Sequence, residues 1–129
     1  MSPNKRVLIA DDESSICEIC HRVLSERGFT VDCAPNGHDA WELLNETDYC
    51  LIILDIRMPR VSGPDVLENL RREHPELLER VILISGDLMN DSTEAFVRAT
   101  DLPFLPKPFL PDELKTIVDR VYRSLYPAS

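Results

Sequence analysis

The chain has 129 residues, of which 43% are hydrophobic and 29% charged, a composition that suits one globular domain and not a disordered chain. It carries 14 Lys and Arg against 23 Asp and Glu, a formal net charge of −9. This balance disfavours direct nucleic-acid binding, because phosphate contacts need clustered basic residues. No apolar run approaches the length of a membrane span or of a signal-peptide core. We therefore expect a cytoplasmic protein without membrane insertion.

Short apolar runs recur along the chain and predict strands. They occupy residues 7–10, 31–34, 51–54, 81–84 and 103–105. Several of these runs are continuous and do not alternate with polar residues, which is typical of parallel strands buried on both faces.

Segments with helical spacing of apolar residues lie between and after these runs. The apolar stripes fall within residues 16–24, 40–44, 66–70, 95–99 and 114–125. Ser15 and Glu18 form a possible capping box for the first helix, and Gly28 is a stop signal. Pro64 and Pro111 are placed to open two later helices. Five strands alternating with five helices predict an α/β, doubly wound parallel domain, in which ligands bind at the carboxyl ends of the strands.

Chemically active side chains follow four of the five predicted strands. Asp11 and Asp12 follow the first strand, Asp55 ends the third, Ser85 ends the fourth, and Lys107 lies just past the fifth. Three carboxylates that converge on one pocket need a cation or protons to coexist, and Mg²⁺ suits such oxygen ligands. A lysine and a hydroxyl beside them would bind phosphoryl oxygens.

Each of these residues also has a plain structural explanation. Asp is common after strands as a turn former or helix cap, so Asp11 or Asp12 alone would be no evidence of a site. The conjunction of all of them, each at or just past the end of a predicted strand, favours a phosphoryl-transfer site.

Four motifs resemble the signature of response regulator receiver domains of bacterial two-component signalling. They are Val7-Leu8-Ile9-Ala10-Asp11-Asp12-Glu13, Leu54-Asp55-Ile56-Arg57-Met58-Pro59 with Gly63 beyond it, Ile84-Ser85-Gly86, and Lys107-Pro108-Phe109. The resemblance covers essentially the whole chain. It implies a flavodoxin-like (βα)5 three-layer sandwich with strand order 2-1-3-4-5, and one receiver domain over residues 1–129 with a core at about 5–126.

The resemblance also implies a role for each site residue. Asp55 would accept a phosphoryl group from a phosphohistidine, and Lys107 would pair with that group. Asp12, Asp55 and the backbone carbonyl of Arg57 would bind Mg²⁺, for which Mn²⁺ is a plausible substitute, while Asp11 would hold the ion through water. In addition, Ser85 and Phe104 would form the switch that rearranges the surface of the fourth helix, fifth strand and fifth helix.

Two features of the backbone follow from the same resemblance. The Lys107–Pro108 bond is expected to be cis, as in the family. Gly63 is expected to shape the loop after the acceptor, where glycine permits positive φ angles.

Arg57 and Asp87 each lie two residues beyond a site residue, at positions that tune phosphoryl lifetime in this family. They could pair across the pocket mouth and hinder water. They could equally be two solvated surface charges.

The four cysteines are expected to be reduced thiols that behave as small apolar residues. Cys17, Cys20 and His21 match the C-x-x-C-H pattern of haem attachment, but they fall within a predicted amphipathic helix, and a fourth zinc ligand is not evident.

The sequence allows three functions. The first is a phosphorylatable signalling switch that catalyses only its own phosphorylation and dephosphorylation. The second is a Mg²⁺-dependent phosphohydrolase with an aspartyl-phosphate intermediate, although Arg57 stands where such enzymes usually carry a second aspartate. The third is a binding-only receiver, which the complete set of chemical residues disfavours.

The expected partner is a histidine kinase or a histidine phosphotransfer protein, and a phosphorylation-dependent dimer is possible. The Leu102–Phe109 segment looks more like receivers appended to hybrid sensor histidine kinases than like those fused to DNA-binding domains. The chain would be either a stand-alone receiver or part of a longer protein.

Overall fold

A computed structural model of the chain describes residues 4–58, 60–86 and 90–127. The strands are β1 (Arg6–Ala10), β2 (Thr30–Ala34), β3 (Leu51–Asp55), β4 (Val81–Ser85) and β5 (Phe104–Pro106). The helices are α1 (Ser14–Glu26), α2 (Gly37–Glu46), α3 (Gly63–Glu73), α4 (Asp91–Thr100) and α5 (Pro111–Leu125), with a 3-10 helix, η1, at Pro75–Arg80.

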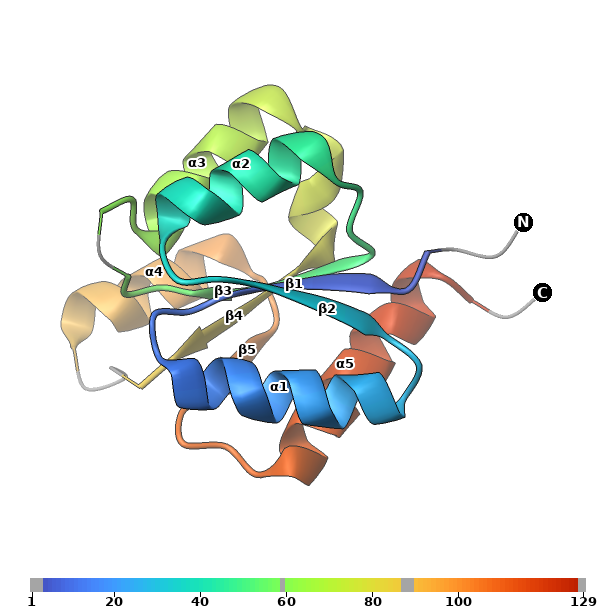
Figure 1. Cartoon of the computed structure of the whole chain (residues 1–129). Helices are drawn as coiled ribbons and strands as arrows, with labels where there is room; N and C mark the ends of the chain where they lie inside the picture. The colour runs from blue at the N-terminus through green and yellow to red at the C-terminus, as the bar shows by residue number, and fades with distance from the viewer. Residues whose placement is uncertain (1–3, 59, 87–89, 128–129) are drawn as a thin grey trace.

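The five strands form one parallel sheet in the order β2-β1-β3-β4-β5. Helices cover both faces of this sheet, with α1 and α5 on one side and α2, α3 and α4 on the other (Figure 1). The predicted fold class and strand order are therefore confirmed. The 3-10 helix η1 was not predicted, because six residues are too few to show a helical period.

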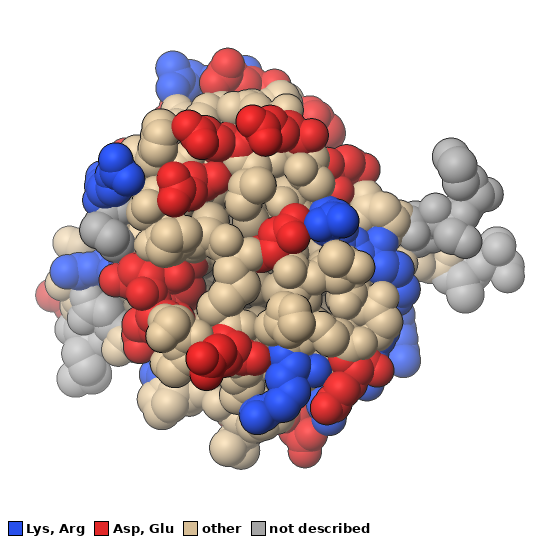
Figure 2. Space-filling model, in the orientation of Figure 1, with Lys and Arg blue, Asp and Glu red and all other residues tan. Residues whose placement is uncertain are grey.

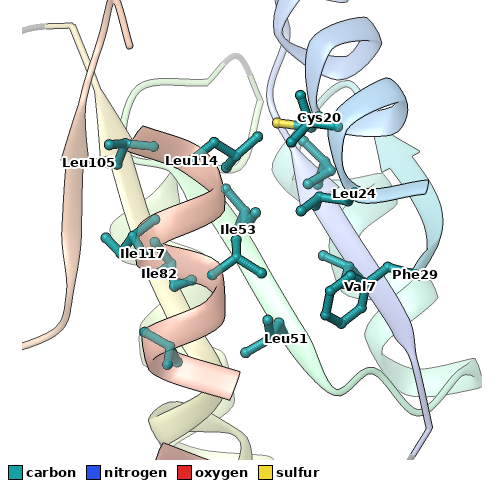
Figure 3. Close-up of a cluster of buried hydrophobic side chains, with 14 of the residues drawn as sticks. Val7, Cys20, Leu24, Phe29, Leu51, Ile53, Ile82, Leu105, Leu114 and Ile117 are labelled. Carbon is teal, nitrogen blue, oxygen red and sulfur yellow. The ribbon is translucent and has the colours of Figure 1, made fainter. Parts of the chain in front are cut away.

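The core is divided in two by the sheet. In β1, Val7 and Ile9 point to the α1–α5 side, while Leu8 and Ala10 point to the other, as the two-residue period of a strand requires. The central strand β3 and its neighbour β4 are buried along their whole length. Figure 3 shows the α1–α5 side, where Ile53 lies between side chains of the two helices.

The helix termini follow the predicted signals with one exception. Gly28 has a φ of +89° just past the end of α1, and α5 begins at Pro111. However, α1 begins at Ser14 with Glu13 as its extended N-cap and no side-chain cap hydrogen bond. The predicted Ser15–Glu18 capping box is therefore wrong, because the helix starts before Ser15 can act as a cap.

The prediction for the cysteines is correct for two of them. Cys20 and Cys50 are buried free thiols, and Figure 3 shows Cys20 on α1 among the core side chains. Cys17 and Cys33, however, form a disulfide between α1 and β2. The packing of α1, which runs antiparallel to β2, brings the two Cα atoms to 6.3 Å, within the range that a disulfide spans. Sequence spacing alone gives no sign of this approach.

Within the described ranges, no helix is both long enough and apolar enough to cross a membrane.

Candidate functional site at the carboxyl ends of the strands

The predicted site residues meet at one edge of the sheet. Parallel register places Asp55 opposite Ile84 at the ends of β3 and β4, and Ser85 opposite Pro106 at the ends of β4 and β5. An open depression of about 510 Å³ lies there. Its lining residues are Asp12, Glu13, Asp55, Arg57, Ser85, Gly86 and Lys107. The strand ends point to the left in Figure 1, and acidic side chains gather at that edge in Figure 2.

Lys107 is the cation at the centre of this site. Its Nζ lies 3.3 Å from Asp55 Oδ2, 2.8 Å from Asp11 Oδ2 and 2.8 Å from Glu13 Oε1. The lysine reaches this position because its backbone N–H continues the ladder beyond β5, donating to the carbonyl of Ser85 at 2.9 Å. The Lys107–Pro108 bond that follows is cis, as the resemblance implied.

Asp55 is almost completely buried, with 3% of its surface exposed. Its Oδ1 accepts a hydrogen bond of 3.2 Å from the backbone N–H of Arg57, and its Oδ2 accepts from Lys107. Both carboxylate oxygens therefore have hydrogen-bond partners among the residues that line the depression.

Glu13 is a member of the site that the sequence interpretation did not select. Its side chain is half-exposed, yet it pairs with Lys107, and its backbone N–H donates to Asp11 Oδ1 at 2.8 Å. The available signal is its position directly after the acidic pair Asp11-Asp12.

The electrostatics of the site reflect an excess of carboxylates. Burial, together with the negative charge of Asp11, raises the pKa of Asp55 from 3.8 to about 6, although Lys107 opposes this shift. Burial alone would lower the pKa of Lys107, but its contacts with the surrounding carboxylates outweigh burial and raise the pKa above its usual value. The site therefore holds Lys107 charged and makes ionisation of Asp55 costly in the absence of a cation.

The acidic residues fit a divalent cation. Oxygen atoms of Asp11, Asp12 and Asp55 all lie within 4.8 Å of one another. Asp11 Oδ2 is buried and accepts no hydrogen bond from the described part of the chain, since Lys107 approaches it as an ion-pair partner outside hydrogen-bond geometry. Carboxylate oxygens gathered in this way are the hard ligands that bind Mg²⁺ directly or through a bound water.

Gly63 is required by the site for a reason different from the one predicted. Its φ is not positive, but a Cβ there would lie 2.5 Å from the carbonyl oxygen of Asp55. The start of α3 therefore packs directly against the backbone of the acceptor residue, and any side chain at Gly63 would displace it.

The remaining predicted residues are placed as follows. Ser85 is fully buried at the end of β4, and Phe104 is half-buried on β5 beside residues of α5. Arg57 is exposed at the mouth of the depression. The predicted partner of Arg57, Asp87, lies outside the described residues, so the lifetime-tuning pair stays a prediction.

Comparison with known families gives one match over most of the chain. The model of the response regulator receiver domain matches residues 7–119. Response regulator Rre1 of Synechocystis is 37% identical over 114 residues, covering 87% of this chain and 49% of the relative. Sensor kinase CckA of Brucella abortus is 34% identical over 126 residues, covering 92% of this chain and 12% of the relative. The chain thus spans about half or less of the curated relatives it matches.

Solved structures agree with this match. The receiver domain of Francisella response regulator 1452 is 29% identical, with a TM-score of 0.79 and coverage of 95% of this chain and 99% of that one. Response regulator TrrA of Thermotoga maritima, in complex with Mg²⁺ and BeF, is 31% identical, with a TM-score of 0.76 and coverage of 91% and 98%. A receiver domain of a histidine kinase from Syntrophus aciditrophicus gives a TM-score of 0.85 at 25% identity, covering 97% and 95%.

Proposed function

This chain belongs to the family of response regulator receiver domains, the phosphoacceptor modules of two-component signalling, and from that premise we propose that Asp55 is its phosphoacceptor. The observation that carries the proposal is the position of the Asp55 carboxylate, 3.3 Å from Lys107 at the floor of an open acidic depression. A nucleophile and a fixed cation are thus placed where an incoming phosphoryl group would contact both.

The transfer needs little covalent chemistry from the protein besides this nucleophile. An oxygen of ionised Asp55 attacks phosphorus, the P–N bond of a donor phosphohistidine breaks, and the histidine leaves with the electron pair. Lys107 stabilises the charge on the phosphoryl oxygens, and the Ser85 hydroxyl binds one of them once it is turned toward the depression. Because Lys107 already lies beside Asp55, its stabilisation of this charge requires no reorganisation during the reaction.

We propose that Asp12, Asp55 and the Arg57 backbone carbonyl bind Mg²⁺, with Asp11 holding it through water and Mn²⁺ able to replace it. The ion would neutralise charge on the phosphoryl oxygens and lower the cost of ionising Asp55. The approach of oxygen atoms of Asp11, Asp12 and Asp55 to within 4.8 Å of one another supports this assignment.

Phosphorylation would act on the rest of the domain through Ser85 and Phe104. Ser85 ends β4, the strand that pairs with β3, where Asp55 is the last residue. Phe104 packs against the core on the α3–α4 side and also borders a hollow lined by residues of α5. A phosphoryl group that binds the Ser85 hydroxyl would favour one arrangement of α4, β5 and α5 over another. That surface is the proposed site of any phosphorylation-dependent dimer.

The donor is proposed to be a histidine kinase or a histidine phosphotransfer protein, and the chain to act in the cytoplasm as one receiver domain over residues 1–129. Its own chemistry would be limited to taking and losing the phosphoryl group, with Arg57 and Asp87 setting the lifetime. Direct nucleic-acid binding is not proposed, since the net charge is −9.

Acetyl phosphate provides the test. The chain is incubated with acetyl phosphate in the presence and absence of Mg²⁺, and the intact mass is followed. The expected result is one phosphoryl adduct that requires Mg²⁺, disappears in Asp55→Asn and persists in Asp112→Asn, a matched change at an exposed carboxylate. Steady turnover of acetyl phosphate without an adduct would favour the phosphohydrolase alternative.

A further inference from the structure

The disulfide between Cys17 and Cys33 joins the start of α1 to the carboxyl end of β2, two segments that border the proposed phosphoacceptor site. Cys17 is the fourth residue of α1 and Cys33 is the fourth residue of β2, the edge strand beside β1. Figure 1 shows α1 running alongside β2 on one side of the sheet.

The four cysteines divide into two reactive classes. Cys33 is exposed and Cys17 is half-buried, so a small molecule can reach the pair. Cys20 and Cys50 are buried, and burial raises their thiol pKa to about 12 and about 11, respectively. Since the thiolate is the reactive form, chemistry with a soluble disulfide or dithiol is directed to Cys17 and Cys33.

A backbone hydrogen bond at or next to each cysteine leads to a residue of the site. The backbone N–H of Cys17 donates to the Glu13 carbonyl at 3.3 Å, and the Glu13 carboxylate lies 2.8 Å from Lys107. Ala34, the residue after Cys33, accepts a hydrogen bond of 3.0 Å from the backbone N–H of Asp11. The disulfide therefore ties the start of α1, whose N-cap is Glu13, to the end of β2, where the Ala34 carbonyl accepts from the backbone of Asp11.

We propose that Cys17 and Cys33 form a reversible thiol switch that sets how readily the site takes a phosphoryl group. The inference rests on the proposed function of Asp55, and it gives this receiver domain a second input besides its phosphoryl donor. Disulfides that open and close in a reducing compartment, such as the proposed cytoplasm, usually sense redox state and do not serve only to stabilise a fold.

The co-reactant is a low-molecular-weight disulfide, R–S–S–R. The Cys33 thiolate attacks one of its sulfurs, the S–S bond breaks, and one R–S⁻ leaves. The Cys17 thiolate then attacks the Cys33 sulfur of the mixed disulfide and releases the second R–S⁻. The two protons lost by the protein thiols end on the two R–SH molecules. The protein is thus oxidised by two electrons while the small disulfide is reduced by two, and excess thiol reverses the reaction.

The direction of the effect follows from Glu13. With the disulfide closed, the first turn of α1 is fixed against β2 and Glu13 stays paired with Lys107, where it competes with a phosphoryl group for the same ammonium. Reduction releases this turn and weakens the competition. Phosphorylation of the reduced form should therefore be faster by about fivefold, the scale of an ordinary coupling between two sites.

The test compares oxidised and reduced samples of the whole chain. One sample is treated with oxidised glutathione and the other with dithiothreitol. Both are desalted, checked for folding by circular dichroism, and phosphorylated with acetyl phosphate and Mg²⁺. Mass spectrometry after thiol alkylation reports which cysteines are bonded. The expected result is a Cys17–Cys33 bond in the first sample only, and slower phosphorylation of that sample.

Three variants identify the route of the coupling. The Cys17→Ser, Cys33→Ser double variant should phosphorylate at the reduced rate under both treatments, whereas Cys50→Ala should keep the difference. Glu13→Gln leaves the disulfide intact, so it remains informative if the double serine variant does not fold, and it should abolish the difference between the two samples.

Equal phosphorylation rates in the oxidised and reduced wild type would overturn the switch while leaving the proposed function of Asp55 intact. A pair that does not close with oxidised glutathione, or does not reopen with dithiothreitol, would also overturn it. The absence of an adduct in both samples would instead defeat the proposed function, and the switch with it.

Discussion

Charged groups are arranged differently at the amino ends of the parallel strands, here called the amino edge, and at their carboxyl ends, the carboxyl edge. At the amino edge, charged groups are matched one to one, as in Arg27 with Asp119 and Arg80 with Asp48, and Lys5 lies over the ring of Phe29 at 4.3 Å. At the carboxyl edge, several carboxylates gather around Lys107. The first arrangement is complete in the folded chain, whereas the second has negative charge left over. We expect this surplus of negative charge to lower stability and, in the proposed function, to favour binding of a cation and a phosphoryl group.

The largest effect that this contrast predicts is on Lys107. Replacing it with Ala removes the positive charge that faces both Asp55 and the incoming phosphoryl group. The rate of phosphorylation by acetyl phosphate should fall on the order of 100-fold, the usual cost of losing one preorganised charge-stabilising group. Lys115→Ala is the matched control, because Lys115 pairs only weakly with Asp112, at 3.8 Å on the exposed surface of α5. A decrease of less than threefold in Lys107→Ala would show that Lys107 is not part of the reaction.

The second effect concerns stability and pH. The pKa of Asp55 is raised from 3.8 to about 6, so the folded state holds this proton more tightly than the unfolded state does. The contribution of Asp55 to stability is therefore lost as pH rises from about 4 to about 6. Without Mg²⁺, Asp55→Asn should be more stable than the wild type by about 1–2 kcal/mol at pH 7, a difference that shrinks toward pH 4.

Urea unfolding in EDTA at several pH values measures this difference. Asp112→Asn serves as the control, and added Mg²⁺ should stabilise the wild type more than Asp55→Asn. An Asp55→Asn variant that is no more stable than the wild type at pH 7 would mean that the carboxyl edge carries no surplus of charge.

The smallest effect is expected at the amino edge. Arg27→Ala removes a partly exposed ion pair with Asp119 and should lower the free energy of unfolding by less than about 1 kcal/mol. The rate of phosphorylation should not change, because this pair lies at the opposite end of the strands. A clear slowing would indicate that the two edges are coupled and that the contrast between them is too simple.

The sequence predicted the fold because the decisive patterns are local. Continuous apolar runs such as Val81–Ile84 mark buried parallel strands, and residues just past those runs must share one edge. This geometry is why Asp55, Ser85 and Lys107 could be grouped from residue order alone.

The sequence could not reveal contacts set by the approach of distant segments. Glu13 pairs with a lysine 94 positions away, and Gly63 is needed because α3 touches the Asp55 carbonyl. The Cys17–Cys33 bond likewise depends on how closely α1 packs along β2. None of these contacts leaves a periodic or compositional signal.

The central claim is that Asp55 carries the phosphoryl group, and reductive trapping tests it most directly. The chain is phosphorylated with acetyl phosphate and Mg²⁺ and treated with borohydride, which converts an aspartyl phosphate to homoserine, and its peptides are then sequenced by mass spectrometry. Homoserine at position 55 alone is the predicted result. Homoserine at position 11 or 12, or an adduct that survives in Asp55→Asn, would contradict it.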